Sequence, residues 1–217
     1  AEDIIISRDI LLAEYVGGVR YHVAHMSTKG AVRLVREAKA RGVSVSCEVT
    51  PHHFLLTDEA IETHGTLAKM NPPLRTQEDI DAILEGLADG TIDCISTDHA
   101  PHAKHEKETD LNSASFGIIG LETAIPIALT ELIHKKKITW SSLIEKMSVN
   151  PRRLLKLPQI RIATGESANL TIIDPSIEFT FAESDIFSKS NNTPFVGSKF
   201  KGRAIGAINH AQAWWRS

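Results

Sequence analysis

A regular alternation of strand-like and helix-like segments in the first half of the chain limits its fold more than any other feature. Amphipathic stretches over residues 28–41 and 76–87 place apolar side chains at helical spacing, and Gly42 and Gly90 follow them where helices commonly end. Apolar or alternating stretches typical of strands cover residues 19–24, 43–49, 67–70 and 92–96. Because strands separated by helices at intervals of about 20–30 residues form parallel βα units, we expect an α/β fold with about four such units.

The length of the chain restricts how much of a larger architecture it can hold. Its 217 residues are too few for a complete (β/α)8 barrel, which takes about 250 residues. Helical patterns continue over residues 121–133 and 141–147, and from about residue 162 short strand-like pieces and turns replace them. We therefore predict a domain of βα units in residues 1–160 and a small β-rich appendage in residues 161–217.

Charge and cysteine content exclude several classes of protein. The 24 Lys and Arg nearly balance the 27 Asp and Glu, and residues 135–137 form the one basic run, whereas nucleic-acid binding needs a concentrated basic face. No apolar stretch approaches the ~20 residues of a membrane span, and the first residues lack the basic region of a leader. Cys47 and Cys94 lie in apolar strand-like segments, as buried thiols of a reducing compartment do. We expect a cytoplasmic protein that binds neither nucleic acid nor membrane.

Polar side chains that can bind a ligand follow each predicted strand. Eight of the ten histidines fall between His22 and His105. The residues after the four strands are, in order, His25, then His52 and His53, then Asn71, and finally Asp98, His99 and His102. The carboxyl ends of parallel strands meet at one rim, and imidazoles with a carboxylate there form the set of ligands that Zn²⁺ prefers. The residues alone do not choose between His52 and His53, and a capped turn explains His102 as well as a substrate contact does.

Five segments carry a resemblance to a known family. They are residues 22–28 (HVAHMST), 48–53 (EVTPHH), 71–75 (NPPLR), 96–102 (STDHAPH) and 120–123 (GLET). These segments, with Asn150-Pro151 and residues 188–195 after them, resemble in order the second half of the dihydroorotases, cyclic amidohydrolases of the amidohydrolase superfamily. The resemblance covers nearly the whole chain. It implies the C-terminal half of a (β/α)8 barrel of the TIM type, followed by the β appendage.

The resemblance also implies a metal site. His25 and His53 would bind the metal, and Asp98 would be both a ligand and the general acid/base. The family pattern favours His53 over His52 because its ligand aligns with the second histidine of the pair. The metal implied is Zn²⁺, with one or two divalent ions in the complete enzyme.

A substrate site is implied by the same resemblance. Asn71 and His102 would hold the substrate carboxylate, with backbone groups near Gly117 helping. The reaction implied is the interconversion of N-carbamoyl-L-aspartate and L-dihydroorotate in pyrimidine biosynthesis.

The sequence departs from the family in one respect. The family's upstream His-x-His pair and bridging lysine or aspartate have no counterpart in this sequence. We therefore expect a fragment that lacks its N-terminal half. The alternatives are a non-catalytic dihydroorotase-like partner, for example of aspartate transcarbamoylase, and a hydantoinase or allantoinase relative, although Asn71 and His102 favour dihydroorotate. Because half a barrel leaves strand edges unpaired, we also expect a homo-oligomer or pairing with the missing half.

Overall fold

The computed structural model describes residues 1–216 and divides the chain into two compact units. The first combines Ala1–Leu121 with Phe187–Pro194, and the second combines residues 122–186 with residues 195–216. The predicted boundary between residues 160 and 161 falls inside the second unit, so the division into a βα domain and an appendage stays a prediction.

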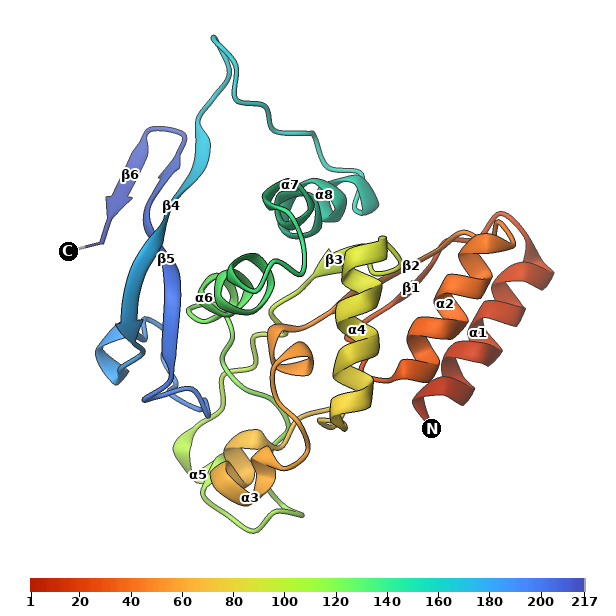
Figure 1. The fold of residues 1–217 in the computed structure, drawn as a ribbon, viewed down its shortest axis with the longest axis horizontal. Coiled ribbons are helices and arrows are strands. Elements are labelled where there is room, and N and C mark those ends of the chain that lie inside the picture. Colours follow the sequence, from red (N-terminus) through yellow and green to blue (C-terminus); the bar gives the residue numbers. More distant parts are fainter. Residues whose placement is uncertain (217) are drawn as a thin grey trace. The chain divides into compact units, whose positions relative to one another are not determined.

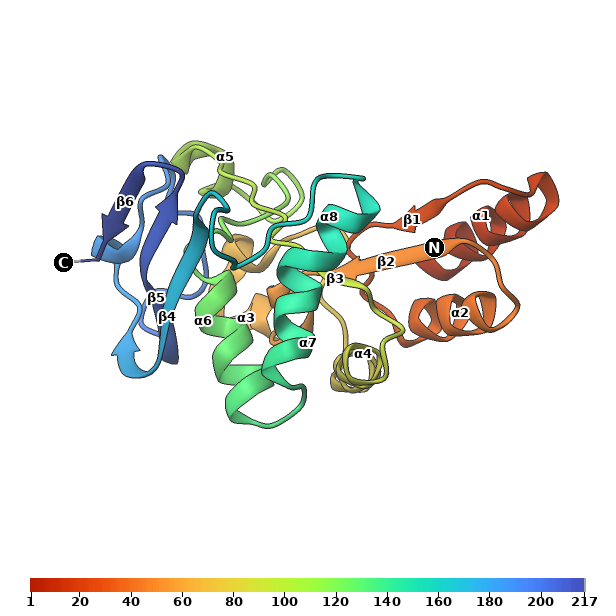
Figure 2. The ribbon, with the colours of Figure 1, turned by 90° about the horizontal axis from the view of Figure 1, so that it is seen from above.

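The first unit contains a parallel sheet of three short strands, in the order β1-β2-β3, accompanied by helices. Its elements are α1 (Glu2–Val16), β1 (Tyr21–Val23), α2 (Lys29–Ala40), β2 (Val45–Val49), α3 (Ala60–His64), α4 (Gln77–Asp89), β3 (Cys94–Ile95) and α5 (Lys104–Lys107). Tyr21 lies opposite Val45, and Val49 lies opposite Ile95. Helices α1, α2 and α4 lie in a row (Figure 1), and α2 and α4 are on the same side of the strands (Figure 2). The predicted parallel α/β arrangement is therefore confirmed for this unit.

Local sequence explains where the two central helices begin and end. Thr28 precedes α2, and its side chain accepts a hydrogen bond from the Ala31 N–H at 3.0 Å. At the start of α4, the Asp79 carboxylate accepts a hydrogen bond from the Thr76 N–H at 3.3 Å, which closes a capping box. Gly90 ends α4 with a left-handed φ of 86°, a conformation that costs glycine little. Both helices agree with the predicted ranges.

The strand predicted over residues 67–70 does not form. Gly65–Ala68 is instead a 3₁₀ turn, in which the Lys69 N–H donates to the Thr66 carbonyl at 3.1 Å. Strand β2 pairs directly with β3, so the sheet has three strands where the sequence predicted four. Ala68 and Met70 are buried in the core, and a short buried apolar run does not by itself distinguish a strand from a turn.

The second unit combines short helices with an antiparallel sheet in the order β4-β5-β6. Its elements are α6 (Ala124–Ala128) with its π-helical continuation Leu129–His134, α7 (Trp140–Ile144) with its continuation Glu145–Val149, α8 (Asn150–Leu154), β4 (Asn169–Thr180), β5 (Lys199–Asn209) and β6 (Gln212–Trp215). Phe181, Phe195 and Phe200 are buried together beside this sheet. The helices and the β-rich tail predicted for this part of the sequence are confirmed.

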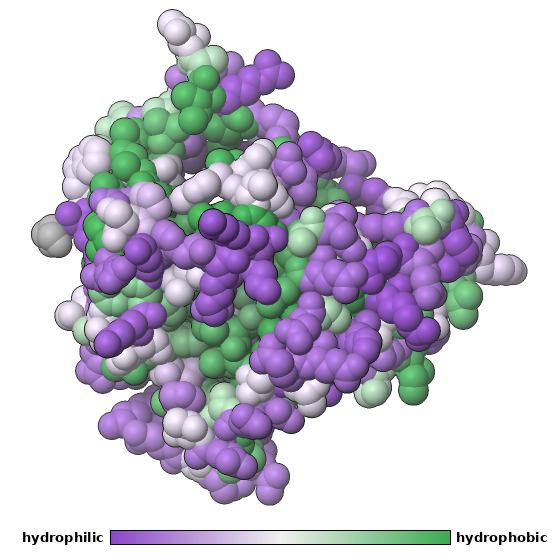
Figure 3. Space-filling model, in the orientation of Figure 1, coloured by the Kyte–Doolittle hydropathy of each residue, from purple (hydrophilic) through white to green (hydrophobic). Residues whose placement is uncertain are grey.

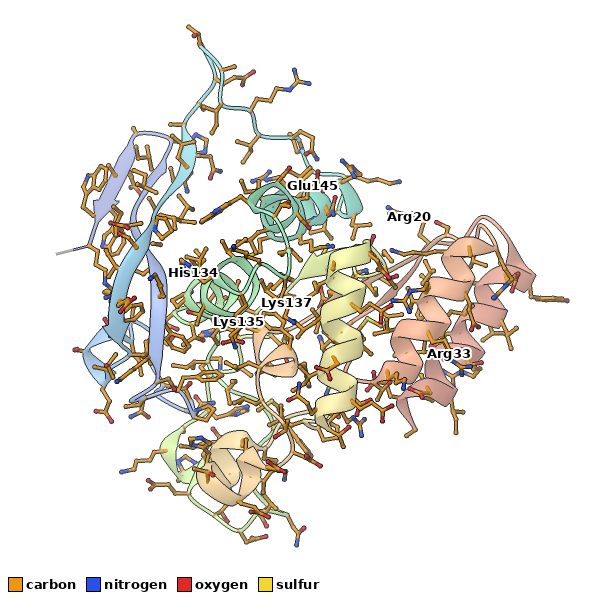
Figure 4. All side chains as sticks on the ribbon, viewed as in Figure 1. Arg20, Arg33, His134, Lys135, Lys137 and Glu145 are labelled. Atoms are coloured by element: carbon orange, nitrogen blue, oxygen red, sulfur yellow. The ribbon has the colours of Figure 1, made fainter. Side chains whose placement is uncertain are left out.

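The features that excluded other classes of protein can be located on the structure. The basic run begins at Lys135, just after His134 at the end of the first helix of the second unit (Figure 4). All three of its residues are exposed. Cys47 and Cys94 are free and buried, as predicted. In the part of the chain that the structure describes, no helix has the length and apolar character needed to cross a membrane.

The surface of the first unit is uneven in character. Hydrophilic residues cover most of α2 and α4 on the face shown in Figure 3. Helix α1 differs, because it buries Ile6, Ile10 and Ala13 on one side and also exposes large apolar residues. The exposed ones are Ile4, Ile5, Leu11, Leu12, Tyr15 and Val16. Exposed apolar patches of this kind mark surfaces that contact a partner.

Candidate metal and substrate site

His25 and Asp98 lie just beyond the carboxyl ends of β1 and β3, the two strands on either side of β2. Both have a positive φ, 39° at His25 and 45° at Asp98. Such backbone conformations are uncommon for residues other than glycine and concentrate at functional sites. The hydrogen bond with Glu48 is the main cause that raises the pKa of His25, and the charge of Asp98 adds to it, so Asp98 lies within electrostatic reach of His25.

Glu48, on β2, supports His25 from behind. Its carboxylate lies 3.4 Å from His25 Nδ1 and 3.4 Å from His22 Nε2. The contact with Glu48 raises the pKa of His25, while burial acts in the opposite direction. Burial alone would raise the pKa of Glu48, but the hydrogen bonds and charges of His22 and His25 outweigh it and lower that pKa to about 2. A carboxylate on one imidazole nitrogen is the usual support of a metal-binding histidine.

Two side chains, those of His25 and Asp98, have atoms that are available to bind a metal ion. Among residues 1–216, neither His25 Nε2 nor the Asp98 carboxylate has a hydrogen-bond partner. An imidazole nitrogen and a carboxylate oxygen are ligands that Zn²⁺ accepts, usually as members of a set of about four. Within the same described residues, no group of three or more His, Cys, Asp or Glu side chains is arranged to hold a metal ion. These two side chains therefore fit as members of a larger ligand set.

His53, to which the family resemblance gave a ligand role, has partners at both ring nitrogens. Its Nδ1 lies 2.7 Å from the Thr50 hydroxyl, and its Nε2–H donates to the Pro72 carbonyl at 2.9 Å. Both ring nitrogens are thus engaged, and burial lowers the pKa of His53. The ring therefore holds the segment that follows Asn71. His52 is also buried, and its Nε2 atom has no hydrogen-bond partner among residues 1–216.

Asn192 organises the loop that carries His102. The His102 N–H donates to Asn192 Oδ1 at 3.1 Å, and Asn192 Nδ2 donates to the carbonyls of Ala100, at 2.9 Å, and Gly117, at 3.2 Å. The His102 Nε2–H donates to the Phe116 carbonyl at 2.8 Å, which leaves Nδ1 as the open nitrogen. Sequence reasoning noted the 188–195 segment but missed this function of Asn192, because the contact spans 90 residues and leaves no local pattern.

Gly117 lies beside His102 but has no backbone group to spare. Its N–H donates to the Lys69 carbonyl at 3.0 Å, and its own carbonyl accepts from Lys107 Nζ at 3.1 Å. A Cβ atom at this position, where φ is 108°, would lie 2.6 Å from Ala100 Cβ. Gly117 therefore allows the close approach of two loop segments, and its N–H and carbonyl are both engaged there.

Asn71 is exposed and has no hydrogen-bond partner among residues 1–216, and its bond to Pro72 is cis. Sequence reasoning missed the contacts that hold the segment after it. The Arg75 guanidinium donates to the Ser27 hydroxyl at 3.1 Å and reaches Glu2 at 3.4 Å, and the Glu2 carboxylate accepts the Ser27 N–H at 2.8 Å. This network joins the residues after His25 to the segment that carries Asn71.

Comparison with known sequences identifies a family. Residues 8–208 match the model of the amidohydrolase family. The chain is similar to the dihydroorotase of Chlorobaculum tepidum, with 52% identity over 98% of this chain and 51% of the relative. It is also similar to the dihydroorotase of Geotalea daltonii, with 51% identity over 96% of this chain and 48% of the relative. The chain thus spans about half the length of the curated relatives that it matches.

The fold of this chain also superposes on solved structures. An L-hydantoinase (dihydropyrimidinase) from Arthrobacter aurescens superposes with a TM-score of 0.91 at 30% identity, over 97% of this chain and 48% of that protein. A dihydropyrimidinase from Brevibacillus agri superposes with a TM-score of 0.91 at 23% identity, over 99% of this chain and 48% of that protein. The second likeness supports the fold alone.

Proposed function

Since this chain belongs to the amidohydrolase family, and the relatives described above are dihydroorotases, we propose that it is part of a metal-dependent cyclic amide hydrolase. Its reaction is the interconversion of N-carbamoyl-L-aspartate and L-dihydroorotate in pyrimidine biosynthesis. The observation that carries this proposal is the pair formed by His25 and Asp98, which follow two strands of one parallel sheet with positive φ and open donor atoms.

In this proposal His25 Nε2 and the Asp98 carboxylate bind one divalent ion, which we take to be Zn²⁺ from the chemistry of the donors. Such an ion lowers the pKa of water to about 7 and polarises the carbonyl group of a ring amide. Glu48 orients the His25 ring through Nδ1, at 3.4 Å, which would leave Nε2 to bind the ion. His53 is assigned no metal and instead positions the segment after Asn71 through the Pro72 carbonyl.

Asp98 moves the proton. In hydrolysis its carboxylate accepts a proton from the attacking water and delivers it to the ring nitrogen as the amide bond breaks. In ring closure it removes a proton from the ureido nitrogen of N-carbamoyl-L-aspartate as that nitrogen attacks the carboxylate carbon, and it passes this proton to the carboxylate oxygen that departs as hydroxide when the carbon–oxygen bond breaks. The Asp98 carboxylate has no hydrogen-bond partner among residues 1–216, which supports this role because its oxygens are accessible to a substrate proton.

Asn71 and His102 bind the substrate carboxylate in this proposal. The exposed Asn71 amide can donate a hydrogen bond, and His102 can donate through Nδ1, since its Nε2–H is used by the Phe116 carbonyl. The Glu106 carboxylate lies 3.8 Å from His102 Nδ1, beyond hydrogen-bond distance, which leaves this nitrogen available to the substrate.

The remaining ligands come, in our proposal, from an N-terminal half outside these 217 residues, which would complete the (β/α)8 barrel. Strands β1 and β3 each pair on one side only within the described sheet. Tyr15 and Ile4 on α1 are 89% and 73% exposed, which supports the proposal that the N-terminal half packs against this helix. Until that half is supplied, we expect the chain to self-associate. Assembly of the complete protein with aspartate transcarbamoylase belongs to the same proposal.

A metal analysis and a dihydroorotate assay test the function. We expect the 217-residue chain to bind at most one divalent ion weakly and to turn over dihydroorotate poorly or not at all, and the complete protein to be active. Two tightly bound ions and ordinary turnover in the 217-residue chain would refute the assignment of the missing ligands. A complete protein without turnover would favour the non-catalytic alternative, tested by co-purification with aspartate transcarbamoylase.

A hydantoinase activity is the second candidate. It is favoured by the superposition on the L-hydantoinase from Arthrobacter aurescens, at a TM-score of 0.91 and 30% identity. The 52% identity to a dihydroorotase favours dihydroorotate. Assays of the complete protein with dihydroorotate, a 5-substituted hydantoin and dihydrouracil separate the two, because only a dihydroorotase requires the ring carboxylate that Asn71 and His102 would bind.

A further inference from the structure

Two lysine side chains donate hydrogen bonds to four of the backbone carbonyls in residues 112–117. Lys107 Nζ donates to the carbonyls of Ser115, at 2.8 Å, and Gly117, at 3.1 Å, and also to the Lys69 carbonyl at 3.3 Å. Lys69 Nζ donates to the carbonyls of Ala114, at 2.6 Å, and Asn112, at 2.9 Å. Lys69 Nζ also lies 4.3 Å from the centre of the Phe116 ring. We call this arrangement the two-lysine clamp.

Lys107 is an unusual residue to find in the interior. It is 2% exposed, and burial, together with the charge of Lys69, lowers its pKa to about 8. An ammonium group has three donors, and its three carbonyl contacts satisfy all of them. The acidic residues beside it on the chain are engaged elsewhere, Glu106 with the Ala103 N–H at 2.7 Å and Glu108 with Lys104 at 3.4 Å. The lysine is therefore held by backbone carbonyls and not by an ion pair.

The clamp joins the two segments to which the proposed function assigns the substrate carboxylate. Lys69 is two residues before Asn71, and the Phe116 carbonyl that accepts from His102 Nε2 is flanked by the two carbonyls that Lys107 holds. The Gly117 N–H also donates to the Lys69 carbonyl, at 3.0 Å. The position of His102 relative to Asn71 thus depends on bonds that converge on the two ammonium groups.

We propose that Lys107, acting with Lys69, is a positioning residue that fixes the 112–117 segment against Lys69 and so sets the spacing between His102 and Asn71. Its importance for substrate rests on the proposed function. The clamp itself is a property of the fold and can be tested without substrate.

Hydrogen exchange on the 217-residue chain tests the clamp directly. In Lys107→Met, we expect the amides of Ser115 and Gly117 to exchange at least about tenfold faster, because hydrogen bonds to a charged donor stabilise the carbonyls around them. Lys104→Met is the matched control, because Lys104 lies on the same helix α5 and its side chain is 77% exposed and, within residues 1–216, pairs with Glu108 alone. Unchanged exchange in Lys107→Met, or an equal change in the control, would overturn the proposal.

A second variant covers the case in which Lys107→Met does not fold. Lys69→Met keeps the backbone carbonyl that Lys107 uses but removes the bonds to Asn112 and Ala114. In this variant we expect faster exchange at the amides of Ser113 and Ala114, which donate to the Asp110 carbonyl. Unchanged exchange at these two amides would count against the clamp.

Kinetics of the complete protein then test the link to substrate. Lys107→Met is expected to raise KM for dihydroorotate about tenfold with little change in kcat, since the reacting groups at Asp98 and His25 are untouched. A fall in kcat alone would contradict the positioning role. A wild-type protein that does not turn over dihydroorotate would refute the proposed function and leave the exchange result to decide the clamp.

Discussion

His25 and Asp98 share a left-handed backbone conformation, with φ of 39° and 45°, at the ends of two strands that flank a common neighbour. This conformation costs a residue with a Cβ atom about 1–2 kcal/mol of free energy, and it costs aspartate and asparagine less because their side chains can form local hydrogen bonds. The backbone thus adopts this less favourable conformation at both residues that the proposed function assigns to the metal ion.

Substitutions at Asp98 separate the chemistry from the backbone. Asp98→Asn keeps the shape and tolerates the positive φ, so we expect an intact fold and a loss of turnover of about 10²–10⁴-fold or more in the complete protein. Asp98→Ala is expected to lower the free energy of unfolding by about 1 kcal/mol relative to Asp98→Asn, since alanine is strained at this φ. Denaturant unfolding of the 217-residue chain measures the difference, and equal stability of the two variants would argue against strain at this position.

Glu48→Gln tests the support of His25. The substitution removes the charge that lies 3.4 Å from His25 Nδ1, so the ring loses its preferred orientation and some basicity. We expect the affinity of the complete protein for its divalent ion to fall about 10–100-fold, as measured by competition with a chelator. Glu78→Gln is a suitable control, because Glu78 is exposed and pairs only with Lys29. Equal affinities in the two variants would remove Glu48 from the site.

The two thiols are predicted to be inert in the folded protein. Cys47 is fully buried, and burial followed by the charge of Asp93 raises its pKa to about 12. Cys94 is 3% exposed. Because the thiolate is the reactive form, we expect neither cysteine to react with a thiol reagent at pH 7 until denaturant is added, when both react. A fast reaction in the absence of denaturant would show that this part of the sheet opens readily.

Much of the fold could be predicted because its causes are local. The spacing of apolar residues predicted one helix that begins near residue 28 and another that ends before Gly90. In the structure Thr28 precedes α2 and Gly90 ends α4. The predicted convergence of His25 and Asp98 followed from the rule that parallel strands end at one rim. The strand expected at residues 67–70 failed because burial of Ala68 and Met70 gives the same apolar pattern in a turn.

The parts of the site that could not be predicted depend on distant contacts. The sequence does not show that the His53 ring lies between the Thr50 hydroxyl and the Pro72 carbonyl, since the second of these partners is 19 residues away. Asn192 and Lys107 make their contacts mainly to backbone carbonyls. A carbonyl is present at every position of a chain, so no pattern of side chains marks such a partner in advance.

A pH-dependent contribution to stability is predicted in the second unit. Asp185 accepts hydrogen bonds from the Arg203 guanidinium at 2.8 Å, from Arg216 and from the Ala182 N–H at 3.0 Å. Burial alone would raise the pKa of Asp185, but the Ala182 N–H and the two guanidinium groups outweigh it, and the pKa is lowered. Around and between the unfolded-state pKa of about 3.9 and the lower folded-state pKa, the unfolded chain therefore binds more protons than the folded one.

The sign of the effect follows from that difference in protons. The stabilisation by Asp185 is complete above about pH 5 and is lost as the pH falls through the unfolded-state and then the folded-state pKa. Asp185→Asn should reduce the free energy of unfolding by about 1–2 kcal/mol at pH 7, and the two stability curves should approach each other in acid. Glu183→Gln, on the same short turn but exposed, should leave the curve nearly unchanged. Chemical denaturation between pH 3 and pH 7 measures both variants, and a constant gap between Asp185→Asn and the wild type would mean that the ion pairs do not set this pKa.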